Sequence, residues 1–270
     1  MTLNVFFSSL RTPRRFFVLC ALLAPAYVPV GTPASVSTSA GKSAGKSVAS
    51  FPMEAQPSLR SPEANSGWQA RIESQFRIAR LKYSGGGDWY NDPSAEVNLL
   101  RFVGEQTNID VDPRYEFVEL SSEKLFSYPM LFMTGHGNVV FSEYEAQRLR
   151  TYLTNGGFLY IDDDYGMDKA LRRELKKVFP DHDLAELPFT HGLYSSHFNF
   201  PNGVPKTHEH DGKPAQGFGL FLKGRLMVYY TYESNPSDGW ADPEIHNNPE
   251  ATRQEALRFG TNIVVWALSR

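Results

Sequence analysis

Apolar runs and amphipathic stretches alternate between residues 76 and 180. Four strand-like runs are predicted, at 76–83, 115–120, 130–134 and 158–161, of which the last is fully apolar. Between them, apolar residues recur at helical spacing over 93–103, 142–153 and 167–179. Repeated strand–helix units of this kind predict a mainly parallel sheet with helices on both faces.

Capping signals set the ends of two of these helices. Asp92, which precedes a proline, predicts the start of the first helix. Ser142 and Glu145 have the spacing of a capping box, and the glycine pair 156–157 ends the helix that follows them.

The pattern changes beyond residue 181. The β-rich segments 217–222 and 225–232 are joined at Lys223-Gly224, which predicts a two-residue hairpin turn. A last helix is expected after Asn248. The predicted fold is therefore three-layer α/β and flavodoxin-like, with a mainly parallel sheet and a late antiparallel hairpin.

The N-terminal segment has the layout of a secretory signal peptide. Three arginines precede the apolar run 16–23, and the small residues Ala24 and Ala26 follow it. We expect a signal peptide at 1–26, with cleavage after Ala34 as the alternative. The apolar stretch is shorter than the roughly 20 residues that span a bilayer, so no transmembrane span is expected in the mature chain. The expected location is periplasmic or extracellular, and an uncleaved N-terminal membrane anchor is the alternative.

Composition separates a linker from a folded domain. Residues 35–66 are rich in Ser, Ala, Gly and Pro and lack hydrophobic periodicity, which predicts a disordered linker. Residues 68–270 are long enough for one α/β domain with its own core. The sequence indicates no oligomeric state.

Charge and cysteine content exclude two classes of function. Residues 1–50 hold five of the 27 Lys and Arg side chains and none of the 30 Asp and Glu side chains. The rest of the chain thus carries 22 basic against 30 acidic residues, a formal charge of −8, which opposes nucleic-acid binding. The single cysteine, Cys20, leaves with the signal peptide, so the mature chain has no cysteine nucleophile.

Polar signatures follow three of the predicted strands, at 84–90, 135–138 and 162–166. In a parallel sheet the ends of such strands meet at one edge, so we expect one pocket there. Its backbone amides, carboxylate and aromatic rings suit a small polar ligand or envelope component, such as a sugar; the alternative is a set of tight turns with Trp89 as a core lid. The candidate ligand-binding residues are Gly85, Gly86, Gly87, Asp88, Trp89, Tyr90, Gly135, Gly137 and Asn138.

The candidate catalytic residues are His136, Asp162, Asp163 and Asp164. Adjacent carboxylates repel one another, which raises at least one pKa and prepares a general acid beside a general base. The same oxygen ligands suit a divalent cation such as Ca²⁺ or Mg²⁺. In the simplest alternative, one aspartate caps the next helix and the others face water.

Two further patterns have weaker functional interpretations. His208 and His210 lie on one side of an extended segment and are candidate Zn²⁺ ligands if His191 or His197 supplies a third; a solvated polar loop is the alternative. The sequence 238–243 repeats the arrangement of 88–93, so the two loops either face each other or match by chance.

Several motifs together resemble those of the bacterial domain of unknown function 4159 family. They are 80–90, the Thr134-Gly135-His136-Gly137 segment, 149–159 and 162–166, with further matches at 224–226 and 260–262. The resemblance covers roughly residues 76–270 and implies a fold similar to class I glutamine amidotransferases. It carries no established activity. Those amidotransferases place a nucleophilic cysteine where this chain has Asp162 to Asp164, so cysteine-dependent chemistry is not expected.

Two functions remain open at this stage. One is an exported hydrolase that acts on a polar or carbohydrate-like envelope substrate through His136 and the acidic run. The other is a noncatalytic domain that binds a ligand or scaffolds the cell envelope with the same groove. The two differ in geometry, because an enzyme needs the imidazole and a carboxylate close enough for proton transfer.

Overall fold

A computed structural model describes residues 75–269. The expected signal peptide, 1–26 or 1–34, and the expected linker, 35–66, lie outside the described residues. Within the described part, no helix combines the length and apolarity that a membrane crossing requires.

The domain is built on a seven-stranded sheet in the order β2-β1-β3-β4-β7-β6-β5. The five strands from β2 to β7 in this order are parallel, β6 runs antiparallel to β7, and β5 runs antiparallel to β6. The strands are β1 (Ile78–Lys82), β2 (Phe117–Glu119), β3 (Met130–His136), β4 (Phe158–Tyr165), β5 (Ala185–Glu186), β6 (Gln216–Leu222) and β7 (Arg225–Tyr232).

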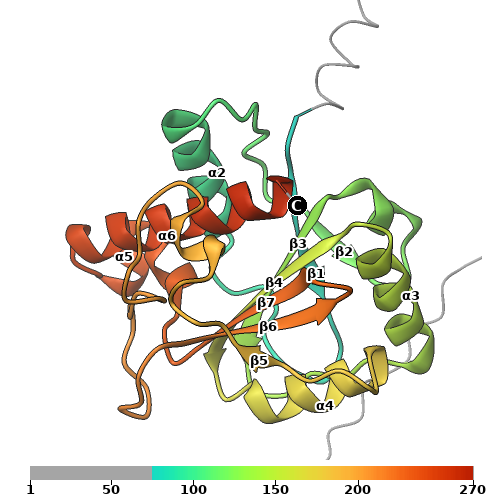
Figure 1. Ribbon diagram of the computed structural model, residues 1–270. Coiled ribbons are helices and arrows are strands. Elements are labelled where there is room, and N and C mark those ends of the chain that lie inside the picture. The colour runs from blue at the N-terminus through green and yellow to red at the C-terminus, as the bar shows by residue number, and fades with distance from the viewer. Residues whose placement is uncertain (1–74, 270) are drawn as a thin grey trace, which may run out of the picture. The chain divides into compact units, whose positions relative to one another are not determined.

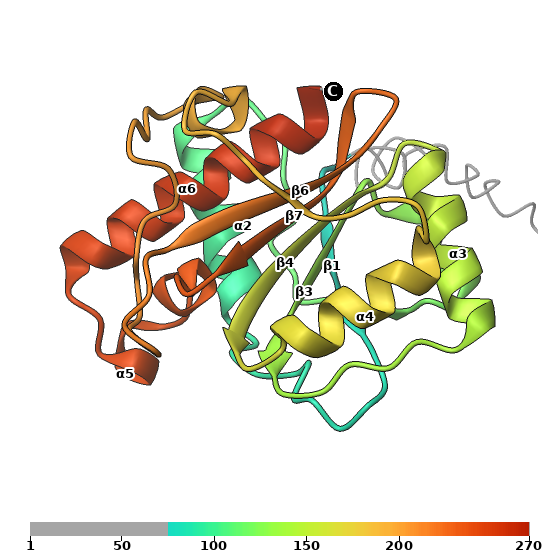
Figure 2. The same cartoon turned by 60° about the horizontal axis from the view of Figure 1, so that its bottom comes forward.

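Helices cover both faces of the sheet. Figures 1 and 2 show α2 and α6 on one face and α3 and α4 on the other, which confirms the three-layer α/β prediction. The α-helices are α2 (Ala95–Gln106), α3 (Glu143–Thr154), α4 (Asp168–Val178), α5 (Pro243–His246) and α6 (Glu250–Ser269). Three 3-10 turns complete the elements: η1 (Glu123–Ser127), η2 (Gly192–Ser195) and η3 (Pro236–Gly239).

The core consists of two apolar clusters, one on each face. Side chains of a strand point alternately to opposite faces, so Leu159 and Ile161 of β4 join the cluster under α3 and α4. Phe158 and Tyr160 join the cluster under α2 and α6. Strands buried on both faces are continuously apolar, which explains why β3 and β4 were predicted from sequence.

Local signals account for the hairpin and for α3. Lys223 and Gly224 have φ values of 50° and 81°, as a two-residue turn with both residues in the left-handed region requires. The predicted capping box of Ser142 and Glu145 forms in both directions. These two predictions are confirmed.

The structure corrects two boundaries. Strand β4 extends to Tyr165, so the acidic run lies within the strand and not after it. Helix α2 begins at Ala95 with Ser94 at the N-cap position, and Asp92 makes no cap. Asp92 instead adopts a left-handed φ of 44°, and its carboxylate binds His246 at 2.9 Å.

Candidate functional site

The pleat of β4 separates the three aspartates. Asp163 points to the α4 face, where its carboxylate accepts the backbone N–H groups of Met167 at 2.8 Å and Asp168 at 3.1 Å. It also accepts the Tyr230 hydroxyl at 3.1 Å. Asp163 therefore caps the start of α4, as the simplest alternative expected of one aspartate. The expectation that the others face water is wrong, because Asp162 and Asp164 are buried.

Asp162 lies on the opposite face and is fully buried. Its oxygens accept the Thr231 hydroxyl at 2.6 Å and both the backbone N–H and the hydroxyl of Ser237, at 2.8 and 2.7 Å. Burial raises the pKa of Asp162 to about 7, although these hydrogen bonds favour the anion. Asp162 ties β4 to β7 and η3 rather than to His136.

Asp164 is the member of the run that meets His136. One of its oxygens lies 3.2 Å from Nδ1 of His136. Asn91 donates to that same oxygen, Oδ2, and Asn235 donates to Oδ1 at 2.6 Å. Burial and repulsion by Asp238 raise the pKa of Asp164 to about 7, and the His136 charge opposes that rise.

His136 is held by a second carboxylate, Asp88. The Asp88 side chain accepts the backbone N–H of His136 at 2.6 Å and lies 3.0 Å from its Nδ1. Partial burial opposes charge on the imidazole, but the carboxylates of Asp164 and Asp88 outweigh it and raise the pKa of His136. The imidazole is half exposed, and its Nε2 has no hydrogen-bond partner among residues 75–269.

The predicted glycine loops position Asp88 and His136 by packing on each other. The N–H of Gly87 donates to the carbonyl of Asn138 at 3.2 Å, and the Asn138 amide donates to the Gly85 carbonyl at 3.1 Å. A Cβ on Gly135 would lie 2.3 Å from the Tyr83 hydroxyl and 3.1 Å from Asp88. These bonds occupy amides that the sequence suggested for a ligand. Gly86 and Gly137, by contrast, have open space where a Cβ would stand.

Aromatic side chains border the 84–90 loop. Trp89 packs edge-on against Tyr90 with ring centroids 5.6 Å apart and against Phe117 at 5.3 Å. Tyr90 is 62% exposed and Phe117 is 53% exposed. Trp89 thus packs against two exposed rings and also against the core cluster under α3 and α4. This contact with the core agrees with the alternative in which Trp89 is a core lid.

Sequence reasoning missed a buried ion pair that supports this loop. Arg80, in the middle of β1, is fully buried and donates twice to Glu96 of α2, at 2.6 and 2.7 Å. Its guanidinium also donates to the carbonyls of Trp89, Asn91 and Asp92. The signal was a cation in the middle of a predicted strand, because a charge that is buried there needs a partner.

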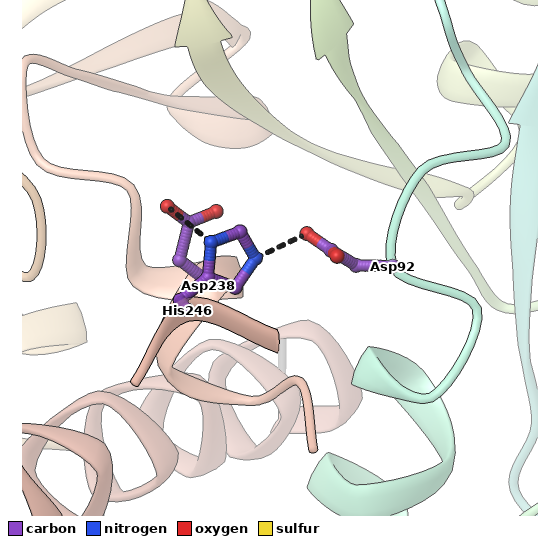
Figure 3. Close-up of side chains that lie close together, drawn as sticks. All are labelled: Asp92, Asp238 and His246. Carbon is purple, nitrogen blue, oxygen red and sulfur yellow. Dashed lines mark hydrogen bonds and ion pairs between the residues drawn. The ribbon is translucent and has the colours of Figure 1, made fainter. Parts of the chain in front are cut away.

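A second polar cluster lies at the same edge of the sheet (Figure 3). Asp92 and Asp238 contact opposite nitrogens of the His246 ring, at 2.9 and 3.7 Å. The 88–93 and 238–243 loops therefore face each other across His246, and Asn98 of α2 donates to the Trp240 carbonyl at 2.9 Å. No pattern in the sequence pointed to His246.

The predicted Zn²⁺ histidines His208 and His210 lie side by side, with ring centroids 5.1 Å apart, but each ring has a different further partner. His208 binds Asp238 at 2.9 Å, whereas the His210 ring stacks on Tyr165. His191 packs against Trp266 and His197 against Phe198. Among residues 75–269, neither joins His208 and His210 in a group of donors spaced for a metal ion.

A cleft of about 320 Å³ adjoins the site. Tyr165, Lys169, His210 and Glu233 are among its lining residues. Tyr165 is the register partner of His136, and its carbonyl accepts the Gly137 N–H at 2.9 Å. The cleft therefore lies beside the Asp88–His136–Asp164 group, but none of these three side chains lines it; of the acidic run, Asp163 does. This cleft is thus not the single pocket that the sequence predicted around Asp88 and His136.

Comparison with known proteins identifies a family without assigning an activity. No curated protein matches the chain. The family described as Domain of unknown function (DUF4159) matches residues 77–268, a span that contains every element from β1 to β7 and the whole site. This match covers most of the chain, and the chain belongs to the DUF4159 family.

Proposed function

We propose that this domain is a hydrolase in which His136 acts as general base toward water, with Asp88 and Asp164 as its partners. The observation that carries the proposal is the placement of two carboxylates on one ring nitrogen, Nδ1, at 3.0 and 3.2 Å. The other nitrogen, Nε2, is then the one that takes the proton of an attacking water. A carboxylate on Nδ1 fixes the tautomer and stabilises the imidazolium that forms.

The two carboxylates have different roles in this proposal. Asp88 accepts both the backbone N–H and the ring of His136, so it orients the imidazole; these hydrogen bonds and the imidazole charge outweigh partial burial and lower the pKa of Asp88. Asp164 is buried, and its pKa of about 7 lets it exchange a proton with the imidazole near neutral pH. Perturbed groups that converge at a sheet edge are typical of active sites.

The surroundings favour a polar substrate with an apolar face. The cleft beside Tyr165 is lined by charged and aromatic side chains. The exposed rings of Tyr90 and Phe117 pack against Trp89 of the 84–90 loop. Aromatic faces next to carboxylates suit a carbohydrate-like envelope component. Water is the nucleophile in this proposal because residues 75–269 contain no cysteine and none of their hydroxyl groups bonds to Nε2 of His136.

The test is a hydrolysis screen with the full-length protein. Carboxylic esters, phosphate esters, glycosides and cell-wall fragments are assayed with wild type, His136→Gln and His182→Gln; His182 lies beyond the end of α4 and is the matched control. We expect turnover of one substrate class, a loss of about 10²–10⁴-fold in His136→Gln, and no loss in His182→Gln. Turnover that survives in His136→Gln, with equal thermal midpoints, would reject the proposal.

A noncatalytic binding domain is the second candidate, favoured by the exposed aromatic pair. Tyr90 and Phe117 are more than half exposed, and Lys82 lies 5.9 Å from the Phe117 ring. In this case no substrate is turned over, and Tyr90→Ala weakens binding to envelope glycans while His136→Gln does not. A glycan array read with these two variants distinguishes the candidates.

We further propose that the chain is exported. The support is the sequence of three arginines, the apolar run 16–23 and small residues at 24 and 26. N-terminal sequencing of protein from the envelope fraction is expected to give a chain that starts near Tyr27 or Ser35. An intact Met1 on protein from the cytosol would contradict export.

A further inference from the structure

The cluster around His246 contains three metal-type donors from three separate segments. Asp92 comes from the loop before α2, Asp238 from η3, and His246 from the end of α5. One donor atom from each lies within 4.8 Å of the other two. Bonds of about 2.0–2.2 Å to a central ion allow donors at most about 4.4 Å apart. Because the two aspartates contact opposite nitrogens of the His246 ring, the ring must turn so that one nitrogen faces both carboxylates before all three donors bind one ion.

Asp238 supplies an independent indication that something is bound there. Its side chain is 1% exposed, and its Oδ1 is buried without a hydrogen-bond partner among residues 75–269. A buried carboxylate oxygen with no partner costs free energy unless a donor or cation satisfies it. Figure 3 shows this carboxylate directed at the His246 ring, with Asp92 on the far side.

The segments that carry the donors are fixed by contacts outside the cluster. Asn98 donates to the Trp240 carbonyl and to Asp242, at 2.9 and 2.8 Å. Arg80 donates to the Asp92 carbonyl at 3.3 Å. The His208 ring holds the other oxygen of Asp238 at 2.9 Å. Such outer contacts orient metal ligands before the ion binds.

We propose that Asp92, Asp238 and His246 bind a divalent transition-metal ion of the Zn²⁺ type. An imidazole nitrogen favours Zn²⁺ and its neighbours over Mg²⁺ and Ca²⁺, which prefer oxygen ligands alone. Three protein ligands leave a coordination position for water or a small ligand. His208 is a positioning residue, because it acts on the ion through Asp238. The proposal does not depend on hydrolysis, since it concerns binding alone.

Calorimetric titration of the full-length protein with Zn²⁺, after treatment with a chelator, tests the site. We expect one equivalent to bind, with His246→Gln and Asp238→Asn each weakening affinity by about 100-fold or more and His208→Gln by about tenfold. His182→Gln, which changes a histidine outside the cluster, is expected to bind as wild type does. Mg²⁺ and Ca²⁺ at the same concentration are expected to give no saturable signal.

Thermal unfolding provides a second readout that does not rely on heat of binding. Zn²⁺ is expected to raise the midpoint of wild type and of His182→Gln, because a ligand of the native state stabilises it. Zn²⁺ is expected to leave the thermal midpoint of His246→Gln unchanged. Equal Zn²⁺ affinity in wild type and His246→Gln, or no binding to wild type, would overturn the proposal and leave a hydrogen-bonded Asp–His–Asp bridge.

Discussion

Asp163 and Asp164 are neighbours in β4, yet they lie in opposite kinds of surroundings. Asp163 accepts hydrogen bonds from two backbone N–H groups and a tyrosine hydroxyl, none of which loses its proton near neutral pH. Asp164 is bonded by two side-chain amides and faces His136, which gains and loses a proton near neutral pH. A carboxylate surrounded by fixed donors stabilises the fold, whereas one beside an imidazole can take part in proton transfer.

The same contrast separates the ion pairs of β1. Arg80 and Glu96 form a buried pair with fixed geometry, and Lys82 and Glu119 form an exposed pair at 2.6 Å. Only the buried pair also holds the carbonyls of the loop that carries Asp88. Of the two ion pairs of β1, the buried Arg80–Glu96 pair is therefore the one that positions the site.

The largest predicted effect is the loss of the buried pair. Arg80→Ala leaves the Glu96 carboxylate buried and unpaired, so we expect the free energy of unfolding to fall by about 3–5 kcal/mol. The exposed counterpart, Lys82→Ala, is expected to cost about 1 kcal/mol or less. Urea unfolding of both variants measures the difference, and equal losses would show that burial of the pair does not matter.

The next prediction compares the two aspartates directly. Asp163→Ala removes the cap of α4 and one of the two acceptors of the Tyr230 hydroxyl, which also bonds Asp168, so we expect a loss of about 2–4 kcal/mol. Asp164→Ala at pH 8 is expected to cost about 1 kcal/mol or less, because it leaves no backbone N–H unpaired and the Asn235 amide keeps the Asp164 carbonyl as an acceptor. Urea unfolding at pH 8 checks this order, and a larger loss for Asp164→Ala would reverse the assignment.

Stability is predicted to fall as pH rises through neutrality. The folded-state pKa values of Asp164 and His136 both lie above their usual values. Such groups stabilise the fold below the unfolded pKa and lose that contribution as pH rises through the folded pKa. For Asp164 the window is between about pH 4 and the folded value of about 7.

Asp164→Asn is expected to reduce the difference in unfolding free energy between pH 5 and pH 8 by about 1–3 kcal/mol. Asp183→Asn, which changes an exposed aspartate that pairs with Lys176, is the matched control and is expected to leave the difference unchanged. A pH dependence identical in wild type and Asp164→Asn would show that Asp164 does not titrate in this window.

Much of the fold followed from the sequence, because buried parallel strands and amphipathic helices leave periodic patterns. The capping box at Ser142 and the turn at Lys223 were local signals with a local cause. Asp162 to Asp164 were placed after the strand because charges rarely lie in one. Asn235 and Ser237 bond these aspartates from more than 70 positions away, and no local pattern records such partners.

The site was predicted in part for the same reason. Asp88 and His136 follow strands whose ends meet at one edge, so topology alone brings them together. Asp92 was expected to cap a helix from its place before Pro93, but His246, 154 positions away, binds its side chain. The similarity to class I glutamine amidotransferases stays a prediction.

In the proposed function, Asp164 and not Asp163 is the partner of His136. An NMR titration of the His136 imidazole in wild type, Asp164→Asn and Asp163→Asn measures this pairing. We expect a His136 pKa above the usual 6.5 in wild type, a decrease of about one unit in Asp164→Asn, and no change in Asp163→Asn. An equal shift in both variants, or none in Asp164→Asn, would show that Asp164 is not the partner of His136.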